Sequence, residues 1–115
     1  EVPSDLKTGR IILDRVYLRD DASIEAAKSS TFLKKDETVK IIETVIIQNS
    51  DEGYDTNHIA VKILSCNNDK YEVRFNNGRE STLEKSGIKI INSWKLVKKN
   101  NGKMGYVCSD FIIEN

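Results

Sequence analysis

Apolar and polar residues alternate along much of the chain with the two-residue period of β-strands. Within residues 10–18 (RIILDRVYL), Val16 and Leu18 fall on one face, and Tyr17 falls on the other with Arg19. Residues 38–47 (TVKIIETVII) are dense in β-branched side chains, which predicts a long strand. Further strands are expected at residues 59–64, 71–75, 88–91, 94–98 and 103–108.

Turn signals separate these segments. Asn77-Gly78 and Asn101-Gly102 supply the positive φ values that a two-residue hairpin turn needs. Residues 23–30 (SIEAAKSS) have a cap-like serine before good helix formers, but they are short enough to form a turn inside a loop. Many short strands with close turns predict an all-β barrel or sandwich.

A small five-stranded barrel has few inward positions, so its core can be listed from the sequence. The expected core residues are Leu18, Leu33, Val39, Ile41, Val97 and Val107. Gly105 is expected where a neighbouring backbone approaches closely or the strand bends.

Composition fits one soluble globular domain. The chain has 115 residues, of which 38% are hydrophobic and 31% are charged. The 18 basic and 18 acidic residues balance, which argues against a dedicated nucleic-acid binder. No apolar run approaches the roughly 20 residues of a membrane span. The chain starts at Glu1 without a visible signal peptide, which favours a mature or trimmed fragment.

Three blocks, in order, resemble the bacterial Src-homology-3-like (SH3b) domain. They are residues 16–23 (VYLRDDAS), residues 32–42 (FLKKDETVKII), and a closing block of residues 94–97 (WKLV) and 101–112 (NGKMGYVCSDFI). Ala22 and Asp36 stand where the family usually has proline and glycine. The resemblance implies a single domain, 1–115, with a small SH3-like barrel at about 10–42 and 94–113. An insertion at about 43–93 would add a β-hairpin or small sheet.

The resemblance also implies a function. In that family, peptide or cell-wall ligands lie in a groove between a long loop and aromatic-bearing strands. The corresponding residues here are Tyr17, Arg19, Asp20, Trp94 and Tyr106. Tyrosine and tryptophan suit binding because they offer large rigid faces with one polar group, although both Trp94 and Tyr106 could instead be core residues.

The expected function is therefore a non-catalytic binding module of a bacterial cell-envelope or secreted protein, with an extracytoplasmic location. Its partner would be a cell-wall peptide or a protein, with no nucleic acid and no membrane span. The alternative is a structural accessory domain whose insertion docks on another domain or subunit. That alternative predicts an exposed apolar patch around residues 59–64.

Reactive residues give weaker signals. Cys66 and Cys108 form no CxxC pair, and they are either a disulfide or two buried thiols. His58 is the only histidine and no motif pairs it with a cysteine, so no catalytic residue and no cofactor are expected. Residues 51–58 (DEGYDTNH) are rich in oxygen ligands, but a solvated turn is favoured over a calcium site, so no metal is expected.

Lysines are concentrated near the end of the chain. Six lysines and no acidic residue lie between Lys85 and Lys103. Such a run could meet an anionic polymer. The interpretation preferred from the sequence is lysine at exposed strand positions, where it discourages edge-to-edge pairing.

Overall fold

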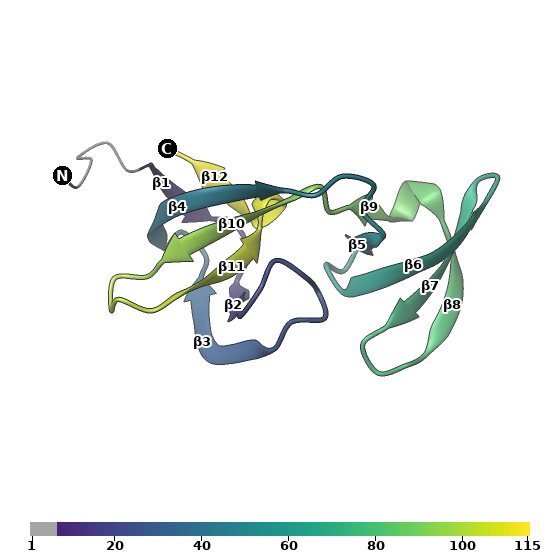
Figure 1. Ribbon diagram of the computed structural model, residues 1–115, viewed down its shortest axis with the longest axis horizontal. Helices are drawn as coiled ribbons and strands as arrows, with labels where there is room; N and C mark the ends of the chain where they lie inside the picture. Colours follow the sequence, from purple (N-terminus) through teal and green to yellow (C-terminus); the bar gives the residue numbers. More distant parts are fainter. Residues whose placement is uncertain (1–6) are drawn as a thin grey trace. The chain divides into compact units, whose positions relative to one another are not determined.

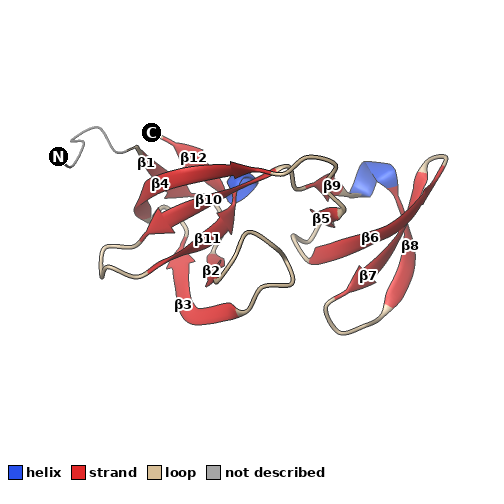
Figure 2. Cartoon of the chain, in the orientation of Figure 1, coloured by secondary structure: helices blue, strands red, loops and turns tan. Residues whose placement is uncertain are grey.

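The protein is built from β-strands and the turns between them. The computed structural model describes residues 7–115, and within that range the helical elements are two short 3₁₀ turns, η1 (Lys85–Gly87) and η2 (Ser109–Phe111) (Figure 2). Residues 23–26 form a bend and turn before the next strand, as the sequence predicts for this loop. The predicted all-β class is confirmed.

The chain divides into two compact units, which we describe separately. The first unit comprises residues 7–22, 26–46 and 93–115, and it contains a seven-stranded antiparallel sheet in the order β12-β1-β4-β10-β11-β2-β3 (Figure 1). Its strands are β1 (Thr8–Ile11), β2 (Arg15–Arg19), β3 (Lys28–Lys34), β4 (Thr38–Ile46), β10 (Ser93–Lys98), β11 (Met104–Cys108) and β12 (Ile112–Glu114). The β-rich stretch at residues 10–18 is interrupted, because residues 12–14 separate β1 from β2.

The second unit comprises residues 23–25 and 47–92, nearly the stretch expected as an insertion. It holds a five-stranded antiparallel sheet in the order β8-β7-β6-β5-β9. Its strands are β5 (Glu52–Tyr54), β6 (Ala60–Asn67), β7 (Lys70–Phe75), β8 (Glu80–Glu84) and β9 (Lys89–Ile90). Both strand orders have two free ends and neither hydrogen-bonded ladder closes, so a small SH3-like barrel stays a prediction.

The core of the first unit matches the sequence expectation. All six predicted core residues are buried in one cluster, which they share with Ile11, Val16 and Ile112. Each of the seven strands supplies at least one member of this cluster, so the sheet curls around a common core. The expected close approach at Gly105 is also confirmed, since a Cβ there would lie 2.5 Å from the Cβ of Leu18.

The two units repeat one arrangement of five strands. In the first unit the five strands are, in chain order, β1, β4, β10, β11 and β12. The first four lie side by side in that order, and the fifth, β12, pairs with the free side of β1. In the second unit, β5 to β9 have the same order. A 3₁₀ turn connects the fourth strand to the fifth in both, η2 in one and η1 in the other.

The repeat extends to an irregularity in the second strand of each set. The register of β4 against β10 skips Ile42, and the register of β6 against β7 skips Leu64. Each skipped residue is the extra residue of a β-bulge, which increases local twist and helps a short sheet to curl. Both bulge residues are exposed, Ile42 to 36% and Leu64 to 39%.

The hairpins between the third and fourth strands are also alike, and they correct the predicted turn type. The N–H of Gly102 donates to the carbonyl of Lys99, and the N–H of Lys99 donates to that of Lys103, so the loop has three residues rather than two. Gly102 has a φ of 90°, whereas Asn101 has no positive φ. A type I turn followed by a left-handed glycine accounts for this pattern.

The second unit has the same loop sequence, Asn76-Asn77-Gly78, with φ of 87° at Gly78. In each loop the second asparagine accepts a hydrogen bond from the backbone N–H two residues later. The distances are 2.9 Å from Arg79 to Asn77 Oδ1 and 3.0 Å from Lys103 to Asn101 Oδ1. This local bond explains why asparagine precedes the glycine in both loops.

Candidate ligand-binding face

The outward face of the first unit brings together residues from three strands. On β2, Tyr17 and Arg19 alternate with the buried Val16 and Leu18, so they point away from the core. The strand register places Tyr106 of β11 opposite Arg19. Tyr17, Arg19 and Tyr106 are each half-buried, so part of every side chain remains available to a ligand.

A fourth residue of this face is Phe32, which the sequence reasoning did not select. Phe32 of β3 lies opposite Tyr17 in the register, and the two rings meet edge to face with centroids 5.8 Å apart. The signal that could have found it is the alternation in residues 32–34, where Leu33 is inward and its neighbours are outward. Edge-to-face pairs of this kind hold both rings in fixed positions.

Cations surround the aromatic pair. The guanidinium of Arg15 lies 4.5 Å from the centroid of Phe32, and its Nη1 donates a hydrogen bond of 3.4 Å to Tyr17 Oη. The ammonium of Lys28 lies 5.7 Å from the centroid of Tyr17. Arg19 is held by a hydrogen bond of 3.1 Å from its Nη1 to the carbonyl of Ala26. This combination suits a ligand with apolar parts and negative charge.

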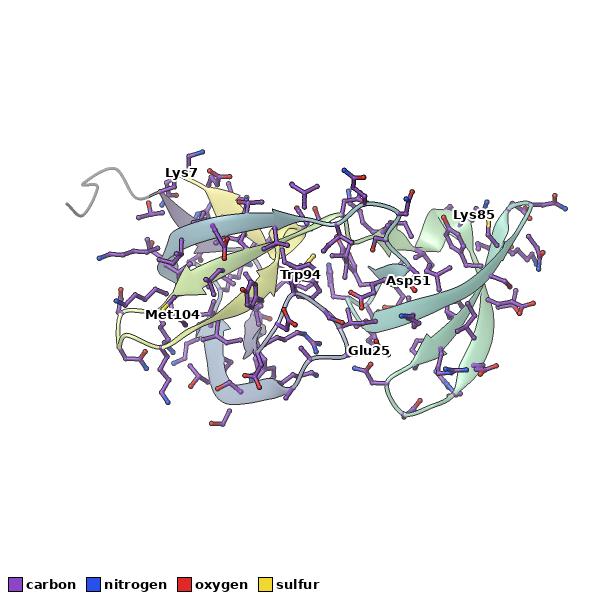
Figure 3. All side chains as sticks on the ribbon, viewed as in Figure 1. Lys7, Glu25, Asp51, Lys85, Trp94 and Met104 are labelled. Atoms are coloured by element: carbon purple, nitrogen blue, oxygen red, sulfur yellow. The ribbon has the colours of Figure 1, made fainter. Side chains whose placement is uncertain are left out.

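The other two predicted groove residues lie differently. Asp20 is exposed directly after β2. Trp94 of β10 is only 2% exposed, and its indole N–H has no hydrogen-bond partner within residues 7–115 (labelled in Figure 3). Thus the structure brings Tyr17, Arg19 and Tyr106 together on one face, whereas Trp94 is not available at the surface.

The two cysteines lie on different strands, and His58 lies in the turn between β5 and β6. Cys66 is an exposed free thiol on β6, and its hydrogen bond with Lys85 raises the pKa of that ammonium. Cys108 is buried on β11. His58 has a φ of 63° in the turn after Tyr54, and its ring lies 5.7 Å from that tyrosine ring.

The oxygen-rich stretch at 51–58 is part strand and part turn. Residues 52–54 form strand β5, so the prediction of a solvated turn is wrong for these three residues. The rest is a turn, because Asp55 Oδ1 accepts hydrogen bonds from the N–H groups of Asn57 and Ile59 at 2.9 and 3.0 Å. Within residues 7–115 no cluster of three metal-ligating side chains is found.

A buried lysine on β10, the middle strand of the same sheet, gives a test of pH dependence. Lys95 Nζ donates to Thr44 Oγ1 and to Glu114 Oε2, both at 3.2 Å, and the Lys95 side chain is only 9% exposed. The hydrogen bond from Lys95, its charge and the nearby Lys7 lower the pKa of Glu114 from its ordinary value of 4.5.

We therefore expect Glu114 to stabilise the fold while it is ionised. A lowered folded-state pKa gives stability that is present above 4.5 and lost as pH falls through the folded value. Glu114→Gln should lower the urea concentration at the unfolding midpoint near pH 7. The midpoint of this variant should also decrease less than that of wild type as the pH becomes acidic. Glu43→Gln is the control, because Glu43 is exposed and has no ion pair among the described residues. Equal pH profiles for wild type and Glu114→Gln would contradict this expectation.

No family model matches the chain, and no curated protein matches it in a sequence search. Within residues 7–115, no helix has the length and apolar character needed to cross a membrane.

Proposed function

We propose that the chain is a non-catalytic binding module of a bacterial cell-envelope or secreted protein. Its first unit would be an SH3-like barrel that recognises a cell-wall peptide through the face formed by Tyr17, Arg19, Phe32 and Tyr106. The observation that carries this proposal is the strand register of β2 against β3 and β11. It places these four half-buried side chains next to one another across the three strands. Rigid aromatic faces with a polar group are the usual anchors of peptide recognition.

Two features of the backbone support the SH3-like part of the proposal. Asp36 has a φ of 69°, so the position where the resembling family usually has glycine takes the left-handed conformation that glycine favours. The final strand follows a 3₁₀ turn, η2, which corresponds to the short terminating turn of the resemblance. Asp36 tolerates this conformation, and its Oδ1 accepts a hydrogen bond of 3.0 Å from Arg10.

The surrounding cations define the ligand more closely. Arg15 and Lys28 keep positive charge beside the rings of Phe32 and Tyr17, and Arg19 adds a third cation on the same face. Short wall peptides carry free carboxylates, which these groups would attract. Recognition rather than chemistry is the role we assign to this face.

Removal of one ring should test the face directly. We expect Tyr17→Ala and Tyr106→Ala each to weaken binding of soluble peptidoglycan peptides about tenfold or more, because truncation of an aromatic anchor removes a large share of contact energy. Isothermal titration calorimetry would measure this. Tyr71→Ala is a matched control, since Tyr71 is also half-buried and has a lysine ammonium 5.3 Å from its ring centroid. Binding unchanged by Tyr17→Ala and Tyr106→Ala would overturn the assignment.

A second candidate function rests on the second unit. Ile59 is 50% exposed and Leu64 is 39% exposed, within the segment where an accessory docking domain would present apolar side chains. Ile59 directly precedes β6, and Leu64 is the bulge residue of that strand, whereas Val61 between them is buried. If wall peptides fail to bind, this surface becomes the preferred site for a protein partner.

A further inference from the structure

Two lysines face each other on the outer surface of the first unit. Lys40 of β4 and Lys98 of β10 are directly opposite in the register, and both are exposed. Each follows a buried valine, Val39 or Val97, so both point away from the core. Like charges directly opposite on antiparallel strands destabilise a sheet. Neither ammonium has a hydrogen-bond or ion-pair partner in the part of the chain that the structure describes.

The second unit contains the same cross-strand pair of cations at the equivalent position. Lys62 of β6 lies opposite Arg74 of β7. It is two residues before the bulge residue of β6, and Lys40 is likewise two residues before the bulge residue of β4. Here both cations are neutralised. Lys62 Nζ lies 3.0 Å from Asp51 and 3.7 Å from Glu25, and Arg74 donates to Glu80 Oε2 at 2.9 and 3.1 Å (Asp51 and Glu25 are labelled in Figure 3).

The first unit lacks these carboxylates at the matching positions. Glu80 lies opposite Arg74 on the fourth strand, whereas Lys98 has Met104 opposite it on β11 (labelled in Figure 3). On the other side of Lys40 the register places Thr8. Glu43 lies two register pairs further along β4, but no ion pair joins it to either lysine within residues 7–115. Among the described residues, the same fold position is therefore neutralised by carboxylates in the second unit and not in the first.

A hollow of about 370 Å³ lies beside this lysine pair. It is lined by Lys40, Lys98, Lys99, Asn100, Asn101 and Gly102. Lys99 is already engaged, because its Nζ donates to the carbonyl of Phe32 at 2.9 Å and lies 3.9 Å from Glu37. Asn101 uses its Oδ1 to accept from Lys103, which leaves its NH₂ group as a donor at the hollow.

We infer that this hollow, with Lys40 and Lys98, is a binding site for a phosphate group that carries two negative charges. In the second unit the two equivalent cations are paired with the carboxylates of Asp51, Glu25 and Glu80. Lys40 and Lys98 together carry two positive charges, so a ligand must supply about two negative charges to neutralise them. A phosphate monoester carries between 1.5 and 2 negative charges near neutral pH and has three strong acceptor oxygens. Those oxygens match two ammonium groups and the amide of Asn101. The site uses other residues than the aromatic face, so either assignment can fail alone.

The test is a titration of the full chain with inorganic phosphate, followed in ¹H–¹⁵N NMR spectra at constant ionic strength. We expect saturable shifts at Lys40, Lys98 and Asn101. A double variant, Lys40→Gln with Lys98→Gln, should weaken phosphate binding about tenfold. The matched control is Lys62→Gln with Arg74→Gln, which removes two cations from the equivalent position of the second unit and should leave phosphate binding unchanged.

Unfolding provides a second measurement with opposite expected signs. The Lys40/Lys98 double variant should raise the unfolding midpoint in the absence of phosphate, because it removes a repulsion. The Lys62/Arg74 double variant should lower it, because it removes ion pairs. Shifts that do not saturate, equal phosphate affinity in the two double variants, or acetate binding as tight as phosphate binding would each overturn the inference.

Discussion

Gly105→Val is expected to destabilise the first unit by roughly 3 kcal/mol or more. A Cβ at residue 105 would lie 2.5 Å from the Cβ of Leu18, and 3.2 Å from both the Cα of Leu18 and the carbonyl oxygen of Arg19. Two of these neighbours are backbone atoms of β2, which cannot move without disturbing the pairing of β2 with β11. The valine branches would add further overlap to a position that already excludes alanine.

Guanidinium denaturation followed by tryptophan fluorescence would measure this change. Trp94 is the only tryptophan and is buried on β10 of the first unit, so its emission reports the unfolding of that unit. Gly87→Ala is the control, because a Cβ there meets no atom within 4 Å, and its effect should stay within about 0.5 kcal/mol. A Gly105→Val midpoint equal to that of wild type would mean that β2 and β11 do not approach as described.

Leu33→Ala should destabilise the fold by about 2–5 kcal/mol. Leu33 is 0% exposed, it pairs with Val16 across β2 and β3, and it belongs to the core cluster of all seven strands. Truncation would remove buried methyl groups from a cluster that has few members. The surrounding strands are tied by hydrogen bonds, so the cavity could collapse only in part.

The same substitution at an exposed leucine provides the comparison. Leu64→Ala removes the same atoms from a bulge residue that is 39% exposed, so its effect should be below about 1 kcal/mol. Chemical denaturation at one pH would compare the two variants. A similar loss of stability at both positions would show that the core cluster is not the main source of stability in the first unit.

Strand patterns and turn signals were enough to predict the all-β class and six of the nine buried residues in the core cluster of the first unit. Val16, Leu18, Val39 and Ile41 are inward because buried and exposed residues alternate with the two-residue period of a strand. The turn type was not predictable from Asn101-Gly102 alone. A two-residue and a three-residue hairpin share that dipeptide, and the choice depends on which backbone groups pair at Lys99 and Lys103.

The candidate face was predictable only in part. Tyr17 and Arg19 follow from alternation within one strand, but Phe32 joins them only through the register of β2 against β3. That register contains a shift between Tyr17 and Arg19, which no local pattern reveals. Trp94 was open to two interpretations, because a tryptophan in a strand can belong either to a core or to a binding surface. The structure shows it to be only 2% exposed.

The repeat of five strands was also hidden in the sequence. In the sequence, the repeat is clearest in the two Asn-Asn-Gly loops. The bulge residues Ile42 and Leu64, and the two pairs of cations, occupy equivalent positions in the two units without being identical residues. Strand order and bulge position are set by backbone pairing, which many sequences can satisfy. The difference in charge compensation between the units could be seen only once equivalent residues were aligned by register.

The most direct test of the proposed function is a two-dimensional NMR titration of the chain with soluble peptidoglycan peptides. The account predicts saturable shifts that cluster on Tyr17, Arg19, Phe32 and Tyr106, with little change in the second unit. A titration that stays flat at millimolar peptide, or shifts confined to residues 47–92, would contradict it.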